Sequence, residues 1–583
     1  MSWSVRLVGA WLVTFATAAP ALTRQIPPAD RPAKPAGESR IQVDGIPVTS
    51  QLVREKCGSC HPSDDKGRMT RISYRRTTPE GWQETIRRMV SLNGVQLEPA
   101  DAREIVRYLA SSHGLAPEEA RPAAFEVERR LIDYKYEPDS DVEQTCTKCH
   151  SMGRVISQRR TKEEWELLMA MHRGLYPLVD GQAFRRQGPA PRDPGPDGRP
   201  PDARHPMDRA VAHLSSAFPL NTPEWAAWSA TMRHPGLEGR WGLAGSQPGK
   251  GRIFGEVAIT AAAQGGPPGN TDLTTEIRYV VAQTGETVER RGTAIVYGGF
   301  QWRGRTTKAG GAEPLREVLF IERDWRRMTG RLFTGAYDEL GLDVSLYRIG
   351  ADPVVLGADP RMLRAGGAAQ VVKVYGANLP MSLSGSDLDF GPGVSVVRIV
   401  DVGSQVATIE VAVAEGAQPG ARDLFLGGAS TPAAVAVYRT IDGIRIAPRT
   451  GMARVGGANF PKQYQQFEAT AYANGPDGKP DTKDDVDLGV VEATWSLEEY
   501  TATYDDDDKE FVGTIDPRSG LFTPAIDGPN PKRRNAANNY GDVWVIASYV
   551  PEGRGGDQEL RARAHLLVTV PLYMRWEPVE VTR

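Results

Sequence analysis

The chain has 583 residues, a length that predicts about four domains. Its formal charge at pH 7 is −3, from 70 basic and 73 acidic residues that are mixed along the chain. This balance gives no reason to expect nucleic acid or an anionic membrane as a partner, and neither is expected.

The N-terminus has the features of an export signal. Arg6 precedes an apolar run over residues 7–19, and the small residues Ala19 and Ala21 flank a proline. This pattern predicts a cleaved signal peptide over residues 1–21. A membrane anchor is the alternative, but the apolar run is shorter than the roughly 20 residues that cross a bilayer. Residues 22–44, rich in Pro, Ala and charge, are expected to be a disordered lead-in.

Two Cys-x-x-Cys-His motifs account for all four cysteines of the chain. They are Cys57-Gly-Ser-Cys60-His61 and Cys146-Thr-Lys-Cys149-His150. This spacing is the attachment signature of c-type haem, in which both thiols form thioethers and the histidine binds the iron. We therefore predict two covalently bound haem c groups. The predicted attachment residues are Cys57, Cys60, Cys146 and Cys149, and the predicted proximal iron ligands are His61 and His150.

Other uses of these cysteines fit the pattern less well. A zinc site needs four ligands that close a small knuckle, whereas the two pairs lie far apart along the chain. A thioredoxin-like pair belongs in a βαβ pattern, which surrounds neither motif. Disulfides do occur in exported proteins, but a Cys-x-x-Cys disulfide closes too small a loop to stabilise a fold much.

The sequence that follows each haem motif repeats. Arg75-Arg76-Thr77-Thr78 precedes Trp82, and Arg159-Arg160-Thr161 precedes Trp165. In both copies a threonine lies four residues before the tryptophan, and an acidic residue follows it closely. This combination predicts that a helix begins at each threonine.

Two candidate iron ligands occupy the same position in this repeat. Met89 and His172 each stand seven residues past the tryptophan, on the same helix face. We predict the ligand pairs His61/Met89 for haem 1 and His150/His172 for haem 2. Met69 is an alternative to Met89, while Met169 and Met171 are alternatives to His172. The histidines without such a placement are expected to be surface or structural residues: His113, His205, His213, His234 and His565.

Each haem motif and the helix that follows it form one unit of the repeat. Each unit needs a further helix to cover the haem edge. Apolar periodicity predicts these helices over Ala102–Leu109 and Met207–Ala217. The segment Gln187–His205, dense in Pro and Gly, is expected to be a surface loop. The pairs Arg75-Arg76 and Arg159-Arg160 have two interpretations, as groups that neutralise haem propionates or as solvated residues before a helix.

After Gly236 the pattern changes to short β-branched and aromatic runs between turn residues. It predicts an antiparallel β-barrel over 236–351 and, with the alternation in Ala407–Val413, an immunoglobulin-like sandwich over 352–440. A last β-sandwich is expected over 441–583. The predicted fold class is thus multidomain: an all-α tandem diheme cytochrome c domain over 45–235, followed by three all-β domains.

The C-terminal half shows no catalytic motif. It has no nucleophile elbow and no phosphate-binding loop. The acidic stretches Asp477–Asp485 and Asp505–Asp508 are expected to be surface turns, with a calcium loop as the alternative for the first. No catalytic residue is predicted on this chain.

The order of these parts, together with four local motifs, resembles the α subunit of quinohemoprotein amine dehydrogenase. The likeness extends over nearly all of the mature chain, although the insertion over Gln187–His205 is longer than the family pattern leads us to expect. The motifs that carry it are Cys57-Gly-Ser-Cys60-His61, Thr78-Pro-Glu-Gly-Trp82, Cys146–His150 and Asn530-Pro-Lys-Arg-Arg534 with Asn538-Asn539.

The resemblance implies a periplasmic αβγ heterotrimer that oxidises primary amines to aldehyde and ammonia. In such an enzyme the β chain is a propeller, and the small γ chain carries a cysteine tryptophylquinone. The present chain would be the oxidoreductase subunit that passes electrons from this quinone through its haems to a soluble copper protein or cytochrome c. Because a methionine ligand raises haem potential, haem 2 is expected to receive electrons and haem 1 to deliver them.

Two other functions are compatible with the sequence. One is a free-standing periplasmic diheme cytochrome or sensor whose β domains bind a partner or a glycan. The other is a diheme enzyme of the peroxidase type, which needs an open distal site on one haem. Stable ligation by both Met89 and His172 would exclude the second.

Overall fold

The computed structural model describes residues 44–123, 141–147, 150–176, 179, 184, 204–262, 272–308, 310, 311, 314–500, 506–551 and 559–571. The predicted signal peptide, nearly all of the predicted lead-in, Cys149 and most of Gln187–His205 lie outside these residues. Within them, no helix is long and apolar enough to cross a membrane.

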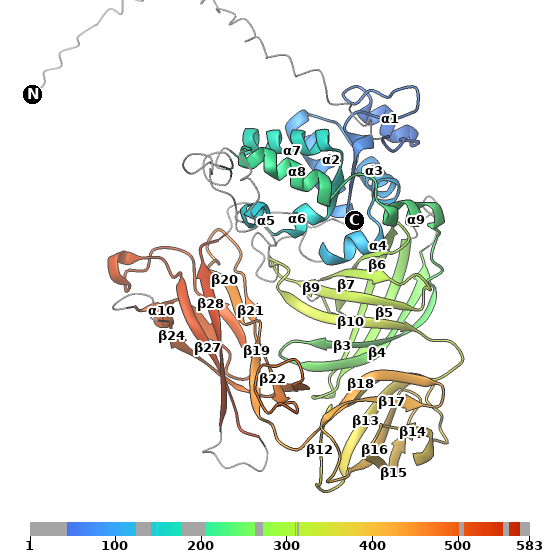
Figure 1. Cartoon of the computed structure of the whole chain (residues 1–583), viewed down its shortest axis with the longest axis vertical. Helices are drawn as coiled ribbons and strands as arrows, with labels where there is room; N and C mark the ends of the chain where they lie inside the picture. The colour runs from blue at the N-terminus through green and yellow to red at the C-terminus, as the bar shows by residue number, and fades with distance from the viewer. Residues whose placement is uncertain are drawn as a thin grey trace, which may run out of the picture. The chain divides into compact units, whose positions relative to one another are not determined.

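The region that holds the haem motifs contains two similar sets of short helices (Figure 1). In each set, a short helix carries the first cysteine of a motif and two longer helices pack on each other. The first set is α1 (Gln51–Cys57), α2 (Pro79–Asn93) and α3 (Pro99–Ser112), and the second is α5 (Asp141–Cys146), α7 (Lys162–Leu175) and α8 (Pro206–Ala217). The other helices here are α4 (Pro117–Ala120), α6 (Gly153–Ile156) and α9 (Pro223–Thr231), with 3-10 turns at Ile72–Tyr74 and Arg121–Ala123.

Both α2 and α7 begin at the threonine that the repeat predicts. The Thr78 hydroxyl accepts a hydrogen bond from the Gly81 N–H at 3.2 Å, and the Thr161 hydroxyl accepts one from the Glu164 N–H at 3.3 Å. These bonds satisfy backbone donors that have no partner inside the helix. The predicted helix starts are therefore confirmed.

The two tryptophans of the repeat are central to two separate cores. Trp82 and Trp165 are each only 1% exposed. Leu109 on α3 belongs to the core of Trp82, and Leu214 on α8 belongs to the core of Trp165. The two helices predicted over 102–109 and 207–217 are thus confirmed as helices, and each unit has its own apolar centre.

A two-stranded sheet connects the two units. β1 (Arg75–Thr77) and β2 (Gln158–Arg160) are antiparallel, and Arg76 faces Arg159 at the centre of the pairing. The residue at a helix N-cap is extended, so the chain approaches both helices as a strand. Each three-residue strand then satisfies its backbone groups by pairing with the other.

The predicted fold class is wrong in its first part. The described residues of 45–235 do not form an all-α diheme domain, because their helices are short and the β1–β2 sheet lies between the two units. In the described part of the chain, β-sheets are the main structure. The sequence pattern missed β1 and β2 because a three-residue strand is too short to show an alternation of apolar and polar residues.

Eight antiparallel strands then close into a barrel, in which β10 pairs with β3 (Figure 1). The interior of a barrel of this size is filled by side chains, and here Trp241, Trp302 and Met328 belong to its core. The strands are β3 (Gly239–Gln247), β4 (Gly251–Ala261), β5 (Asp272–Val281), β6 (Thr287–Tyr297), β7 (Gln301–Lys308), β8 (Leu315–Ile321), β9 (Arg327–Thr334) and β10 (Leu340–Arg348).

A buried ion cluster attaches α2 to the barrel. Glu80, in the first turn of α2, lies 2.5 Å from Arg303 Nε on β7 and 3.2 Å from Arg316 Nη2 on β8. Burial raises the pKa of Glu80, but the two guanidinium groups lower it by more, so the net direction is downward. The carboxylate therefore stays charged and fixes the start of α2 against two barrel strands.

The next part consists of two four-stranded sheets around one core. Alternate residues of β16, among them Ala407, Ile409 and Val411, are fully buried, as the alternation predicts. One sheet has the order β11 (Val354–Asp359), β13 (Gln370–Ala377), β16 (Val406–Val413), β15 (Val394–Val402). The other has the order β12 (Met362–Arg364), β18 (Ala429–Tyr438), β17 (Gly420–Leu426), β14 (Leu388–Asp389).

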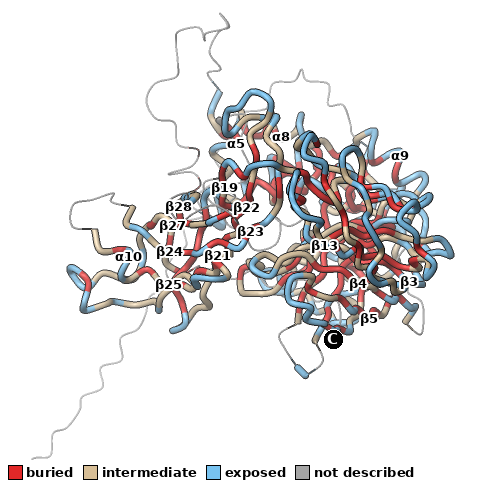
Figure 2. Tube along the Cα trace, turned by 90° about the horizontal axis from the view of Figure 1, so that it is seen from below, coloured by how far each residue is buried: buried red, intermediate tan, exposed pale blue. Residues whose placement is uncertain are grey.

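The last part has three sheets that share one core, which includes Phe467, Trp495 and Phe522. The buried residues of the β regions lie along their strands (Figure 2). The first sheet is β19 (Gly443–Ala447), β22 (Glu468–Ala473), β23 (Val486–Val491). The second is β20 (Thr450–Arg454), β28 (Leu560–Thr569), β27 (Gly541–Tyr549), β24 (Thr494–Glu499). The third is β21 (Gln465–Gln466), β26 (Leu521–Pro524), β25 (Gly513–Ile515), and the short helix α10 spans Asp508–Phe511.

Candidate functional site

Each haem motif begins at the last residue of a short helix. Cys57 ends α1 and Cys146 ends α5. After Cys57 the backbone continues in a tight turn, because the N–H groups of Cys60 and His61 both donate to the Cys57 carbonyl, at 3.2 and 2.9 Å. Neither Cys57 nor Cys60 is in a disulfide. This turn brings the residues that would attach haem 1 close together. In the second motif, Cys149 lies outside the described residues.

The three histidines predicted as iron ligands share one hydrogen-bonding pattern. In each ring Nδ1 lies next to a backbone carbonyl: Thr70 for His61 at 3.0 Å, Ser151 for His150 at 2.9 Å, and Leu168 for His172 at 2.8 Å. A carbonyl only accepts, so Nδ1 carries the proton and Nε2 keeps its lone pair. Metal-binding histidines are oriented in this way.

The two histidines predicted as ligands of haem 2 lie near each other. The rings of His150 and His172 have centroids 6.5 Å apart and planes inclined at 45°. An ion bound to both Nε2 atoms at about 2.0 Å would hold the ring centroids about 6 Å apart, so the observed spacing fits an iron between them. Burial lowers the pKa of His150 to about 4 and also lowers that of His172, which keeps both rings neutral as ligands must be.

Met89 occupies the position on α2 that His172 occupies on α7. Its side chain is half-buried, and Asn93 Nδ2 lies 3.8 Å from its sulfur. In the described part of the chain, no contact joins Met89 to His61, so this ligand pair stays a prediction. The alternative ligands Met69 and Met169 are buried in the cores of their units, and Met171 packs against the second core.

The histidines without a predicted iron-binding role use other contacts. His113 is fully buried, with Ser112 Oγ at 2.8 Å from Nδ1 and the Ile46 carbonyl at 3.2 Å from Nε2. Three others, His205, His213 and His565, contact the Met207 N–H, Glu143 and Asp542, respectively.

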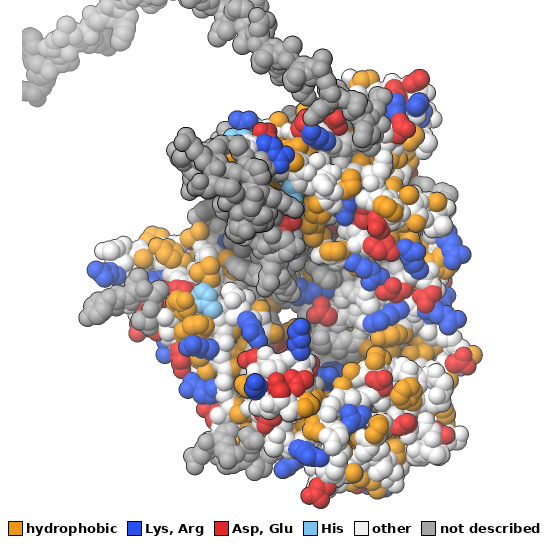
Figure 3. Space-filling model, viewed as in Figure 1, with side chains coloured by type: hydrophobic (Ala, Val, Ile, Leu, Met, Phe, Trp, Pro, Cys, Tyr) orange, Lys and Arg blue, Asp and Glu red, His pale blue; other side chains and the backbone are white. Residues whose placement is uncertain are grey.

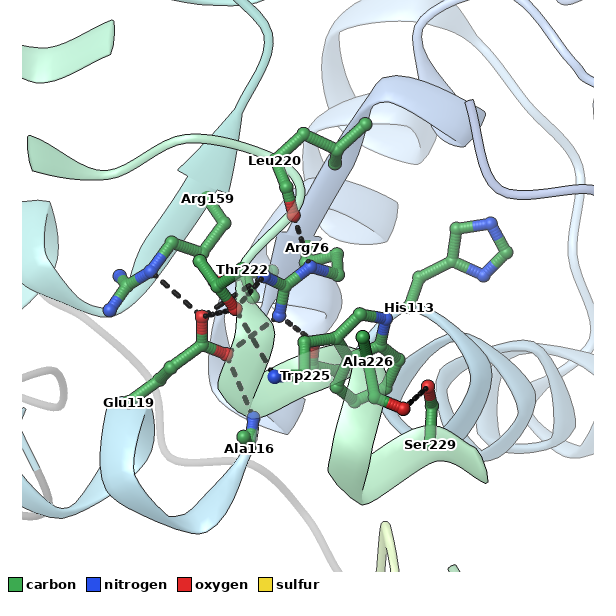
Figure 4. Close-up of polar contacts among 12 residues, drawn as sticks. Arg76, His113, Ala116, Glu119, Arg159, Leu220, Thr222, Trp225, Ala226 and Ser229 are labelled. Carbon is green, nitrogen blue, oxygen red and sulfur yellow. Dashed lines mark hydrogen bonds and ion pairs between the residues drawn. The ribbon is translucent and has the colours of Figure 1, made fainter. Parts of the chain in front are cut away.

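Arg76 and Arg159, which face each other at the centre of the β1–β2 sheet, are not the solvated residues that one interpretation expects. Arg76 is fully buried and Arg159 is 8% exposed, so they are not solvated. Both bind Glu119, which accepts from Arg76 Nη1 at 2.7 Å, Arg76 Nη2 at 3.0 Å and Arg159 Nε at 3.1 Å (Figure 4). Thr222 Oγ1 at 2.8 Å and the Ala116 N–H at 2.8 Å complete the carboxylate's contacts.

Glu119 is therefore the charged centre of the junction between the two units. Burial raises the pKa of Glu119, but the hydrogen bonds and charge of Arg76, with the charge of Arg159, lower it further, and the net pKa lies below its usual value. The carboxylate holds both strands of the β1–β2 sheet and, through Thr222, the start of α9. Sequence reasoning missed Glu119 because nothing in its own neighbourhood distinguishes it from Glu118.

The acidic stretches of the last β region are partly paired with arginines in the described part of the chain. Glu499, Asp506 and Asp508 have ligand atoms within 4.8 Å of one another. Arg533, however, binds Asp507 at 2.6 Å and also binds Asp508, so part of this charge is already neutralised. The residues of the first acidic stretch are likewise paired, for instance Asp481 with Arg445 at 3.0 Å.

Family models match four stretches of the chain. Residues 48–189 match the model described as quinohemoprotein amine dehydrogenase A, alpha subunit, haem binding. Residues 234–349, 352–439 and 444–581 match domains II, III and IV of the quinohemoprotein amine dehydrogenase alpha subunit. The first match confirms that the region with both Cys-x-x-Cys-His motifs is a haem-binding region.

Comparisons with curated proteins and with solved structures give no further information about fold or function. No curated protein matches the chain. A redesigned β-barrel has a TM-score of 0.16 and 15% identity, and the likeness covers 20% of this chain and 92% of that one. The I9–I11 tandem of titin has a TM-score of 0.10 and 7% identity, with 48% of this chain and 92% of that one covered. Scores this low carry no argument about fold or function.

Proposed function

Because this chain belongs to the family of quinohemoprotein amine dehydrogenase alpha subunits, we propose that it is the electron-transfer subunit of such an enzyme and binds two haem c groups. The observation that carries this proposal is the pair His150, in the second attachment motif, and His172, whose ring centroids lie 6.5 Å apart with planes inclined at 45°. Haem, when bound there, supplies a carrier of single electrons.

The chain's own residues hold and orient these groups. Cys57 and Cys60 attach one haem, and Cys146 and Cys149 attach the other. The carbonyls of Thr70, Ser151 and Leu168 hold the protonated Nδ1 of the three histidines, which leaves each Nε2 lone pair available to bind iron. Met89, at the position on α2 that matches His172 on α7, would supply the fourth protein ligand.

The amine is oxidised elsewhere in the complex. Partner chains, a β propeller and a small γ chain with a cysteine tryptophylquinone, supply the amine-oxidising site, and a soluble copper protein or cytochrome c accepts the electrons. The proposed location of the assembly is the periplasm, which agrees with the predicted signal peptide. Lys/Arg and Asp/Glu side chains are interspersed over the face seen in Figure 3, which favours protein partners over a polyanion.

The proposal is tested on the native complex, purified through a tag on this chain. Adding a primary amine under anaerobic conditions is expected to convert the visible spectrum of both haems to the reduced form. A tertiary amine, which cannot form an imine with a quinone, serves as the matched control and should leave the haems oxidised. Haems that dithionite reduces but primary amines do not would refute the proposal.

A further inference from the structure

The other arginines of the pairs Arg75-Arg76 and Arg159-Arg160, which are Arg75 and Arg160, belong to a second cluster at the junction of the two units. Arg75 on β1 and Arg160 on β2 are paired across the two-stranded sheet. Their exposures are 8% and 4%. The Thr85 hydroxyl on α2 accepts from Arg75 Nη1 and, at 3.2 Å, from Arg88 Nη2, so two guanidinium groups meet at one oxygen.

Positive charge exceeds negative charge in this cluster. Arg75 donates to the neutral oxygens of Thr85 and Gly81, and its Nε atom is buried without a hydrogen-bond partner. The Glu164 carboxylate forms ion pairs with both Arg160, at 3.5 Å, and Arg71, at 2.8 Å, so one negative charge is shared by two arginines. Burial, followed by the charges of Arg160 and Arg88, lowers the pKa of Arg75, and burial lowers that of Arg160 to about 9.

Such an arrangement is costly without an anion. An arginine stays charged in proteins, and a buried charge without a partner costs several kcal/mol. The cation–π contacts of Arg75 with Trp82 at 5.1 Å and of Arg160 with Trp165 at 5.7 Å offset only part of this cost. The cluster therefore has three properties of an anion site: it is buried, it carries excess positive charge, and Arg75 Nε is a donor without a partner.

Predicted iron ligands of haem 1 lie next to this cluster. Arg88 directly precedes Met89 on α2. The Thr70 carbonyl lies 3.0 Å from His61 Nδ1, and the next residue, Arg71, shares Glu164 with Arg160. The cluster is therefore connected to both ligands predicted for haem 1.

We propose that Arg75, Arg88 and Arg160 bind haem propionates at the junction of the two units. The proposal rests on the haem-binding function stated above. A propionate ends in a planar carboxylate, which matches the fork of donors on a guanidinium group. The three arginines would bind the propionates beside the β1–β2 sheet and would raise the potential of the haem they contact, because positive charge favours the reduced form.

The test uses Arg75→Gln in the full chain, matured with its haems. Spectroelectrochemical titration is expected to show a midpoint potential shifted downward for at least one haem. Arg75→Lys, which keeps the charge, should recover most of the shift. Arg87→Gln is the matched control, because Arg87 lies on α2 beside Arg88 but is 39% exposed and paired with Glu84 at 3.6 Å; it should leave both midpoints unchanged.

The outcomes separate this proposal from the haem-binding function itself. Mass spectrometry of each variant counts the attached haems, so failure of haem attachment is seen directly. If Arg75→Gln does not accumulate, Arg88→Gln gives the same measurement. Unchanged midpoints in the variant that retains its haems would overturn the propionate assignment. A wild-type midpoint that follows added inorganic phosphate, with a response lost in the variant, would also overturn it, because the anion would then come from solution.

Discussion

Glu119→Ala is expected to destabilise the haem-binding region by about 3–5 kcal/mol, the usual cost of removing one partner from a buried ion pair. The side chains of Arg76 and Glu119 are 0% and 4% exposed, so the substitution leaves the Arg76 charge buried without its carboxylate. Arg159 and Thr222 lose the same acceptor. The measurement is hydrogen exchange of the β1, β2 and α9 amides, which reports this region separately from the β domains.

Glu118→Ala is the matched control for this prediction. Glu118 is the preceding residue, but its ion pair with Arg323 is exposed at the surface, and such pairs contribute about 1 kcal/mol or less. Equal protection of the amides in both variants would contradict the role assigned to Glu119.

The contribution of Glu119 to the stability of the haem-binding region also depends on pH. Because the pKa of Glu119 is lowered in the folded state, its stabilisation is fully present above the usual value of 4.5 and is lost as the pH falls through the lower folded value. Glu119→Gln should therefore show less acid-induced loss of protection than the wild type.

The second large effect is expected from His172→Met. This substitution places at the second haem the ligand type that Met89 provides at the same position of the first unit. Methionine raises haem potential relative to histidine, so the midpoint of haem 2 should rise by more than about 59 mV, a tenfold change for a one-electron couple. Redox titration measures this change, and haem 1 is the internal control because its ligands are untouched.

A substitution of His213 to Gln serves as the external control. His213 contacts Glu143 and is not a predicted ligand. It should leave both midpoints in place. An unchanged haem 2 midpoint in His172→Met, or a high-spin spectrum of haem 2 in the wild type, would show that His172 is not the distal ligand.

Local signals in the sequence predicted where α2 and α7 begin. The threonines that cap these helices fix their starts, and a fixed start sets which residues share a face two turns later. The rings of His172 and His150 lie near each other, while the assignment of His172 as an iron ligand stays a prediction. The haem motifs themselves need no tertiary information, because cysteines and histidine are adjacent in the chain.

The junction between the units could not be predicted in the same way. Glu118 and Glu119 are chemically identical neighbours, yet one is exposed and the other is the buried centre of the junction. The side-chain partners of Glu119, which are Arg76, Arg159 and Thr222, lie 43, 40 and 103 residues away along the chain, so no short sequence window contains the cluster. The strands β1 and β2 exist because they pair with each other, which is also a long-range property.

The measurement that tests the central claim most directly is mass spectrometry of the intact chain, matured in a host that attaches c-type haem, with peptide mapping of both motifs. The account predicts two covalently attached haems, one on the peptide of Cys57 and Cys60 and one on the peptide of Cys146 and Cys149. A chain that carries haem on one motif only, or has a disulfide in place of a thioether pair, would contradict it.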